Sequence, residues 1–214
     1  ERIVFIGKDR EGKLRKKWRG LSRDKLIFID MYPEDSVGFN DRRIVHVEDY
    51  QLAQLEQYGI KPIKRKITTN ISKRVVLYPE TAFKKEKWHP DNFIRLYRSL
   101  KSKNIDVCLL KSLALDIDAE TKDIVSITEL EKMRNFFYKG GIFVSNDSGM
   151  AHFAGVCGLF TITIFSGFEP AIWHPRGDHL TFKTGTDLID TELLEKKIID
   201  IYCHLDNGKI RLSS

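Results

Sequence analysis

Two short segments of this chain carry residue types that could bind an anion. The first runs from Val144 to Gly155 and reads V-S-N-D-S-G-M-A-H-F-A-G. An apolar strand ends there, small polar residues turn the chain, and a helix begins; the backbone N–H groups at such a helix start attract phosphate. Gly149 would let a ligand approach the backbone, Ser148 adds a hydroxyl, and His152 could donate to the same anion.

The first segment also has a purely structural interpretation. Asp147 or Ser148 would then only cap the helix, and His152 would be a buried, hydrogen-bonded histidine. The segment alone leaves the two interpretations open.

The second segment runs from Tyr78 to Pro90 and reads Y-P-E-T-A-F-K-K-E-K-W-H-P. It too follows an apolar strand and precedes a helix. Thr81 offers a hydroxyl, and Lys85 or Lys87 could neutralise a pyrophosphate. The alternative is a solvated basic turn with Trp88 packed beneath it.

The elements that must position these residues alternate between strand and helix. Continuous apolar runs predict buried strands over residues 2–7, 25–31, 74–78, 105–110, 141–145 and 161–165, with a further short one at 124–125. Helices are predicted over residues 48–58, 90–103, 150–157 and about 191–205, and another begins at residue 128. This alternation indicates an α/β fold with a parallel sheet covered on both faces. In such sheets ligands bind where strand carboxyl ends meet helix N-termini, which is where both segments lie.

The organisation along the chain predicts two lobes joined by a polar, basic connection over residues 61–73. We expect residues 1–70 to form a partial N-terminal α/β lobe with its linker, because they are too few for a full Rossmann lobe. Residues 71–190 would form a Rossmann-like α/β domain, and residues 191–214 a C-terminal helix and tail.

Taken together, in this order and at this separation, the two segments resemble glycosyltransferase family 9. The family is best known for the ADP-heptose:lipopolysaccharide heptosyltransferases. The resemblance is carried by strand-P-x-T, by K-x-K-W-x-P-x-N-F, and by V-S-N-D-S-G-x-x-H-x-A-G about 55 residues further on. The segments at residues 164–170 and 173–177 also look like those of the family, and the resemblance covers roughly residues 45–180.

The resemblance implies a GT-B-like architecture, in which two Rossmann-like lobes flank the active site and the C-terminal lobe binds the donor. It implies inverting transfer of a sugar, a heptose or related hexose, from a nucleotide diphosphate (ADP-heptose being one candidate) to a lipopolysaccharide or other cell-envelope glycan. No metal or other cofactor would be needed. The implied donor-binding residues all lie on the two segments: Thr81, Lys85, Lys87, Asp147, Ser148, Gly149, Met150 and His152.

Three departures from the family pattern affect these expectations. The family's usual lysine position carries Glu86, so that role passes to Lys85 or Lys87. Residues 111–114 read K-S-L-A where the family has a Gly-Gly turn near the nucleoside. The family's general base is an aspartate in a G-D motif after the first strand, whereas Gly7-Lys8-Asp9 has its aspartate one residue out of place.

The missing motif leaves the catalytic base unassigned, and an inverting transfer needs one. The alternative function is therefore a non-catalytic or truncated nucleotide-sugar-binding module that lacks the acceptor-side base.

The charge composition bears on which binding partners the chain could have. Lys and Arg outnumber Asp and Glu by 36 to 30, a net charge of +6, and the excess is concentrated in residues 8–23 and 61–87. This suits an anionic glycan or lipopolysaccharide core at the inner membrane surface. No basic helix with interleaved aromatic residues supports nucleic-acid binding.

The sequence also bears on membrane-spanning, secretory and metal-binding segments. No apolar run approaches the roughly 20 residues of a membrane span, and no secretory signal is visible, so we expect a cytoplasmic protein that could contact the inner membrane peripherally. The three cysteines are far apart, which argues against a zinc site. Asp116-Ile117-Asp118 has the letters of a D-x-D metal motif but an apolar setting, so we expect no metal there.

Overall fold

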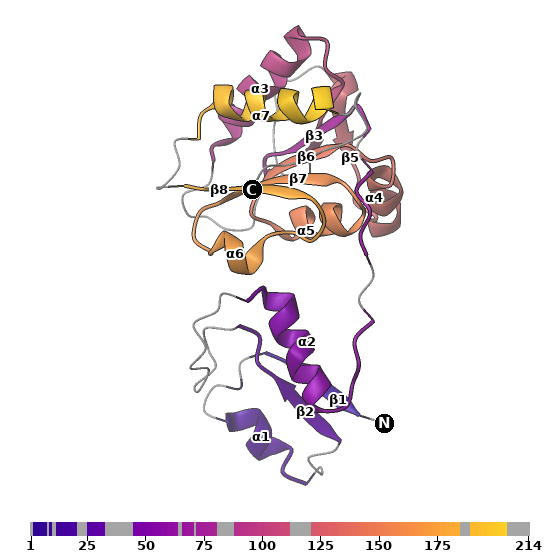
Figure 1. The fold of residues 1–214 in the computed structure, drawn as a ribbon, viewed down its shortest axis with the longest axis vertical. Coiled ribbons are helices and arrows are strands. Elements are labelled where there is room, and N and C mark those ends of the chain that lie inside the picture. The colour runs from indigo at the N-terminus through magenta and orange to yellow at the C-terminus, as the bar shows by residue number, and fades with distance from the viewer. Residues whose placement is uncertain are drawn as a thin grey trace. The chain divides into compact units, whose positions relative to one another are not determined.

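The structure, a computed structural model, describes residues 2–7, 9, 12–20, 25–32, 45–63, 66–70, 72–80, 88–111, 121–184 and 189–204. The chain divides into two compact units. The first contains residues 1–65 and 171–173, and the second contains residues 66–170 and 174–214. Figure 1 labels the elements of both units.

The second unit is built on a six-stranded sheet in which every pairing is parallel. The strand order is β5-β4-β3-β6-β7-β8. In chain order the strands are β3 (Val75–Tyr78), β4 (Val107–Lys111), β5 (Ile124–Ser126), β6 (Ile142–Asn146), β7 (Phe160–Phe165) and β8 (His179–Lys183). The expected parallel α/β sheet is therefore confirmed.

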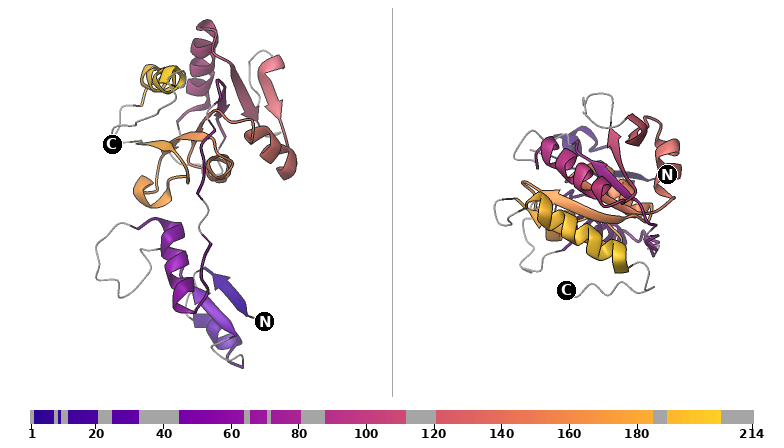
Figure 2. Two further views of the ribbon diagram at one scale, coloured as in Figure 1. Left: turned by 45° about the vertical axis from the view of Figure 1, so that its right-hand side comes forward. Right: turned by 90° about the horizontal axis from the view of Figure 1, so that it is seen from above.

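Helices cover both faces of this sheet. They are α3 (Pro90–Ser102), α4 (Leu130–Phe137), α5 (Gly149–Val156) and α7 (Thr191–His204), with a short 3₁₀ turn at Thr121–Asp123. The four-residue helix α6 (Pro170–Trp173) follows β7 in the chain, and its last three residues belong to the first unit. Side chains alternate along a strand, so Val75 and Leu77 of β3 join the core formed with α3 and α7, whereas Val76 joins the core formed with α4 and α5. Figure 2 shows α3 and α7 side by side.

Continuous apolar strands follow from this two-sided burial. All six residues of β7, F-T-I-T-I-F, are buried, as are all five of β6. Strand β8 was not among the predicted strands. Its sequence H-L-T-F-K alternates, but only Phe182 of its residues is fully buried, since the strand lies at the sheet edge.

The described residues of the first unit include a two-stranded parallel sheet and helical segments. Strands β1 (Ile3–Ile6) and β2 (Leu26–Ile29) pair in register, and the helices are α1 (Lys13–Lys17) and α2 (Val47–Gln57). Gln54 of α2 ties that helix to the end of β2, since its amide accepts from Asp30 N and donates to Asp30 O.

One prediction for this unit was wrong. Residues 2–7 were expected to form a buried strand, but Ile3, Val4 and Ile6 are 49%, 40% and 43% exposed. Strand β1 pairs only with β2 among the described residues, so an apolar run that would be core in a wide sheet keeps much of its surface in solvent.

Within the described ranges, no helix has both the length and the apolar character that crossing a membrane requires.

Candidate functional site

The strand order places a topological switch point at the centre of the second unit's sheet. Strands β3 and β6 are neighbours, with β3 followed outward by β4 and β6 followed outward by β7, so the chain turns in opposite directions on the two sides. Ligands of open α/β sheets bind at the carboxyl ends of strands beside such a point. The two segments singled out in the sequence directly follow β3 and β6.

The junction between β6 and α5 has the predicted geometry. Strand β6 ends at Asn146, and the backbone N–H of Asp147 donates to Ile164 O at 2.8 Å. Ser148 is the N-cap, with φ −161° and ψ 157°, and its Oγ accepts from Ala151 N at 3.3 Å. Gly149 is the first residue of the helix. The capping interpretation of Ser148 is therefore correct, and its contact with a ligand stays a prediction.

The start of α5 can be reached from outside. Gly149 is exposed, and a Cβ atom added to it would meet nothing within 4 Å. The backbone N–H groups of Gly149 and Met150 stand at the first two helical positions, where no intrahelical acceptor is available. Because Ser148 already caps Ala151, the N–H groups of Gly149 and Met150 are the ones to which the prediction of anion binding applies.

The other predicted residues of this segment have mixed surroundings. Asp147 is partly buried, and that burial raises the pKa of its carboxyl to about 6. His152 is partly exposed and lies in the first turn of α5, as the fourth helical residue. Met150 is partly buried and packs against the core between the sheet and α4 and α5. Its side chain thus contributes to packing, and the prediction that Met150 binds the donor concerns its backbone N–H.

Sequence reasoning missed a side chain that joins the two segments. Asn146, only 2% exposed, accepts from Trp88 N at 2.9 Å through Oδ1 and donates to Trp88 O at 3.2 Å through Nδ2. Trp88 is itself anchored, because its Nε1 donates to Ile189 O at 3.0 Å and its ring meets Phe93 edge-on. The buried amide therefore holds the end of the second segment beside the end of β6.

Thr81, Lys85 and Lys87 lie outside the described residues, in the part of the second segment that precedes Trp88. The described ends of that segment, Glu80 and Trp88, show where it leaves β3 and where it is clamped.

A third segment of the resemblance packs against α5. A Cβ atom on Gly155 would stand 2.4 Å from Arg176 O and 3.2 Å from Pro175 Cβ. Gly177 has φ +90°, a conformation that favours glycine, and a Cβ atom added to it would stand 3.3 Å from Gly155 O. The two glycines let the helix and the segment at residues 173–177 approach each other at backbone distance.

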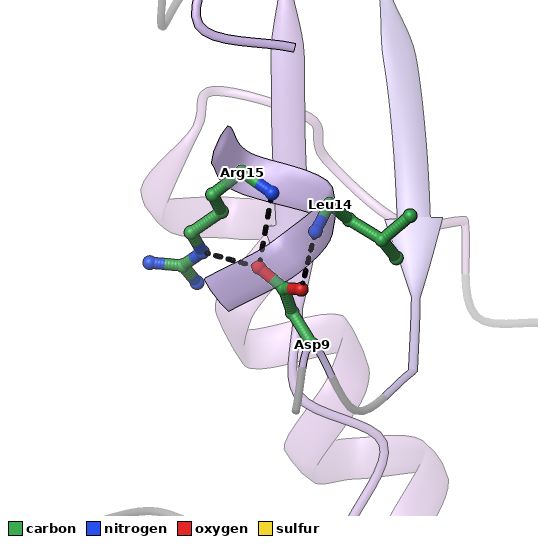
Figure 3. Close-up of polar contacts among 3 residues, drawn as sticks. All are labelled: Asp9, Leu14 and Arg15. Atoms are coloured by element: carbon green, nitrogen blue, oxygen red, sulfur yellow. Dashed lines mark hydrogen bonds and ion pairs between the residues drawn. The ribbon is translucent and has the colours of Figure 1, made fainter. Parts of the chain in front are cut away.

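The aspartate considered as a catalytic base has a different role (Figure 3). Asp9 Oδ1 accepts from Leu14 N at 2.8 Å, and Oδ2 accepts from Arg15 N at 3.1 Å and lies 3.7 Å from Arg15 Nε. Gly12, the residue at the N-cap position of α1, has no side chain to do this. Asp9 thus caps α1 with both oxygens, its side chain is 8% exposed, and no catalytic base is assigned.

No group of three or more His, Cys, Asp or Glu side chains suited to a metal ion occurs within the described ranges. Residues 112–120, which include Asp116 and Asp118 and most of the departure at 111–114, lie outside those ranges.

The fold and the switch-point junction define an α/β protein with an exposed helix start at the centre of its parallel sheet. Comparison with family descriptions then gives the family: glycosyltransferase family 9 (heptosyltransferase) matches residues 42–191. Because this match spans more than half of the chain, the chain belongs to glycosyltransferase family 9 and to the glycosyltransferase class of enzymes. A comparison with curated protein sequences finds no significant match.

Solved structures show the same fold. The Escherichia coli heptosyltransferase WaaC with ADP aligns with a TM-score of 0.61 at 12% identity, over 94% of this chain and 73% of that one. The family 9 glycosyltransferase of Veillonella parvula DSM 2008 aligns with a TM-score of 0.66 at 13% identity, over 93% and 73%. WaaC with ADP-2-deoxy-2-fluoro heptose gives 0.50 at 14% identity, over 89% and 69%. At these identities the likeness concerns the fold, and it confirms the expected GT-B-like architecture, of which this chain spans a part.

Proposed function

We propose that this chain transfers a heptose or related hexose from a nucleotide diphosphate, ADP-heptose being the leading candidate, to an anionic glycan of the lipopolysaccharide core or cell envelope. The observation that carries the proposal is the junction from β6 to α5 at the switch point of the sheet. It offers an exposed helix start whose first two N–H groups lack intrahelical acceptors. The donor's diphosphate would bind there.

The other donor contacts follow from the same placement. His152, on the first turn of α5, would donate to the diphosphate, and Thr81 with Lys85 or Lys87 would bind it from the segment after β3. The Asn146–Trp88 clamp supports this arrangement, because it fixes the end of that segment next to β6. The two WaaC structures support the choice of donor, since one contains ADP and the other an ADP-heptose analogue.

The proposed reaction is metal-independent and inverting. Fixed N–H groups and a lysine would stabilise the departing diphosphate, the task that a divalent cation performs in other transferases. The excess of basic residues in the first unit favours an anionic acceptor and a peripheral contact with the inner membrane.

One observation favours a second function. Asp9, the only candidate that the sequence offered as base, is occupied as a helix cap. A chain without a base would bind the nucleotide-sugar and not transfer it, so a non-catalytic or truncated donor-binding module is the alternative.

A transfer assay separates the two functions. Purified chain is mixed with an ADP-sugar, a lipopolysaccharide-core acceptor and EDTA, and the product's anomeric configuration is read by NMR. The proposal expects an inverted product whose yield EDTA does not reduce. Saturable donor binding with no product would select the module, and absence of donor binding would contradict both.

A further inference from the structure

The first unit holds a cavity that the proposed donor site does not use. Its volume is about 630 Å³, within the range of small-molecule sites. The cavity is open to solvent and is lined by residues of α1 and the turn after it, by Leu26 and Phe28 of β2, and by Tyr58, the residue after α2.

The cavity lies on the α1 face of the two-stranded sheet, between α1 and β2. Leu26 is the first residue of β2 and pairs with Ile3, the first residue of β1. Alternation places Leu26 and Phe28 on one face of β2, away from the buried Ile27 and Ile29. All residues that line the cavity belong to the first unit, and none of them is a residue of the proposed donor site. The cavity is therefore a separate feature of this unit.

The charged side chains that line the cavity are all positive among the described residues. Three of the lining residues are cations, and no acidic residue lines the cavity among those described. Arg15 is held in place, because its guanidinium lies 4.7 Å from the centroid of the Phe28 ring and its Nε approaches Asp9, as Figure 3 shows. Lys16 and Arg19 are exposed, and neither forms an ion pair within the described part of the chain. These two cations supply the positive charge for an incoming anion.

The cavity also has an apolar aromatic wall. Trp18 and Phe28 have ring centroids 6.5 Å apart, and Tyr58 is 43% exposed. Aromatic faces pack against the C–H groups of a sugar ring. Inorganic phosphate has no such C–H groups. Cations beside partly exposed aromatic rings therefore fit a ligand that has both a phosphate group and a ring of pyranose size.

We propose that this cavity binds a phosphorylated sugar, with the phosphate on Lys16 and Arg19 and the sugar ring against Trp18. The guanidinium of Arg19 can bind a phosphate through two N–H groups at once. The inference deepens the proposed function, because such a ligand would be an anionic part of the acceptor. Only the identification of the ligand as part of the acceptor rests on the proposed transferase function, since binding in the cavity requires no transfer.

The test is a calorimetric titration of the whole chain with glucose 6-phosphate, glucose and inorganic phosphate. Lys16→Gln/Arg19→Gln is compared with Lys13→Gln/Lys17→Gln, which removes the same charge from exposed residues of the same helix that do not line the cavity. We expect glucose 6-phosphate to bind more tightly than the other two probes. Its Kd should rise about tenfold or more in the first variant and stay within about twofold in the second. Equal weakening in both variants, or no preference for glucose 6-phosphate over phosphate, would overturn the proposal.

A vesicle arm identifies the source of the phosphate. Phosphatidylglycerol vesicles carry a lipid phosphate and no sugar ring, so the proposal expects them to bind less well than glucose 6-phosphate at equal phosphate concentration. Binding to vesicles alone, lost equally in both variants, would replace the cavity with a basic membrane surface. ADP-sugar titrations separate this proposal from the proposed donor site. Binding of glucose 6-phosphate without binding of an ADP-sugar would contradict the donor site alone. Binding of an ADP-sugar without binding of glucose 6-phosphate would contradict the cavity proposal alone.

Discussion

His152 is the residue at which ligand binding and folding are most easily separated. A histidine in the first turn of α5 that donates to a diphosphate contributes a hydrogen bond to a charged group. His152→Ala should therefore weaken donor binding by about 1.5–3 kcal/mol and leave the melting temperature nearly unchanged. His152→Gln, which keeps an N–H donor, should recover part of the loss. The two quantities are measured on the same protein by calorimetric titration and thermal unfolding. A lower melting temperature with unchanged donor affinity would mean that His152 serves packing instead.

Asp147 makes the stability of the second unit depend on pH. Burial raises the pKa of its carboxyl to about 6, so the folded state binds the proton more tightly than the unfolded state does. The resulting stabilisation is present below the unfolded pKa of about 4 and is lost as pH rises through about 6. Asp147→Asn cannot lose it, so the variant's melting temperature should gain on that of the parent between about pH 4 and about pH 8. Parallel curves for the two proteins over that range would refute this role of burial.

At the residue scale, the sequence could predict groups and not partners. The order strand, N-D-S-G, helix predicted the helix start to within one residue and Asp147 or Ser148 as its cap, because both are local features of the chain. The pairing of Asn146 with Trp88 spans 58 residues and depends on β3 and β6 being neighbours. No local pattern encodes that neighbourhood. The cap made by Asp9 was missed for a related reason, since the carboxylate reaches N–H groups five and six residues away.

At the element scale, α5 has a glycine at each end, and the two glycines have different surroundings. A Cβ on Gly149 would enter open space, whereas a Cβ on Gly155 would stand 2.4 Å from the carbonyl oxygen of Arg176. Gly155→Ala should destabilise the protein by about 1–3 kcal/mol, because the obstacle is backbone and cannot rotate away. Gly149→Ala should keep stability within about 0.5 kcal/mol and lower donor affinity about tenfold or more, since its methyl occupies the path of the ligand.

Chemical denaturation and donor titration of both glycine variants provide the check, and each variant is the control for the other. If Gly149→Ala bound donor as tightly as the parent, the helix start would not be where the diphosphate binds. If Gly155→Ala were as stable as the parent, the close approach of α5 to residues 175–177 would be wrong.

The elements also show where apolar patterns succeed. Strands β3, β6 and β7 were predicted because burial on both faces makes their sequences continuously apolar. The same rule failed for β1, whose apolar run is largely exposed in a two-stranded sheet, and it could not find β8, an edge strand with polar residues. An apolar run shows only that a strand is hydrophobic. Whether the strand is buried depends on the number of strands and helices that pack beside it.

At the scale of the whole molecule, we propose different ligands for the two units. The second unit offers backbone N–H groups at a switch point, which suits a diphosphate, and the first offers basic and aromatic side chains around a cavity. Sequence reasoning predicted the first of these and saw only the charge of the second. The reason is that a helix start has a local signature, whereas the cavity is formed by residues from 12 to 58 that meet only in the folded unit.

The central claim is that the junction of β6 and α5 binds a nucleotide diphosphate sugar. The most direct test is a thermal unfolding series with ADP-, UDP- and GDP-sugars in EDTA, run on the parent protein and on Gly149→Ala. We predict that at least one donor stabilises the parent, by about 2.7 kcal/mol at a concentration of 100 times its Kd. At the same concentration the stabilisation should be much smaller in Gly149→Ala. No stabilisation by any donor, stabilisation that EDTA abolishes, or equal stabilisation of both proteins would contradict the account.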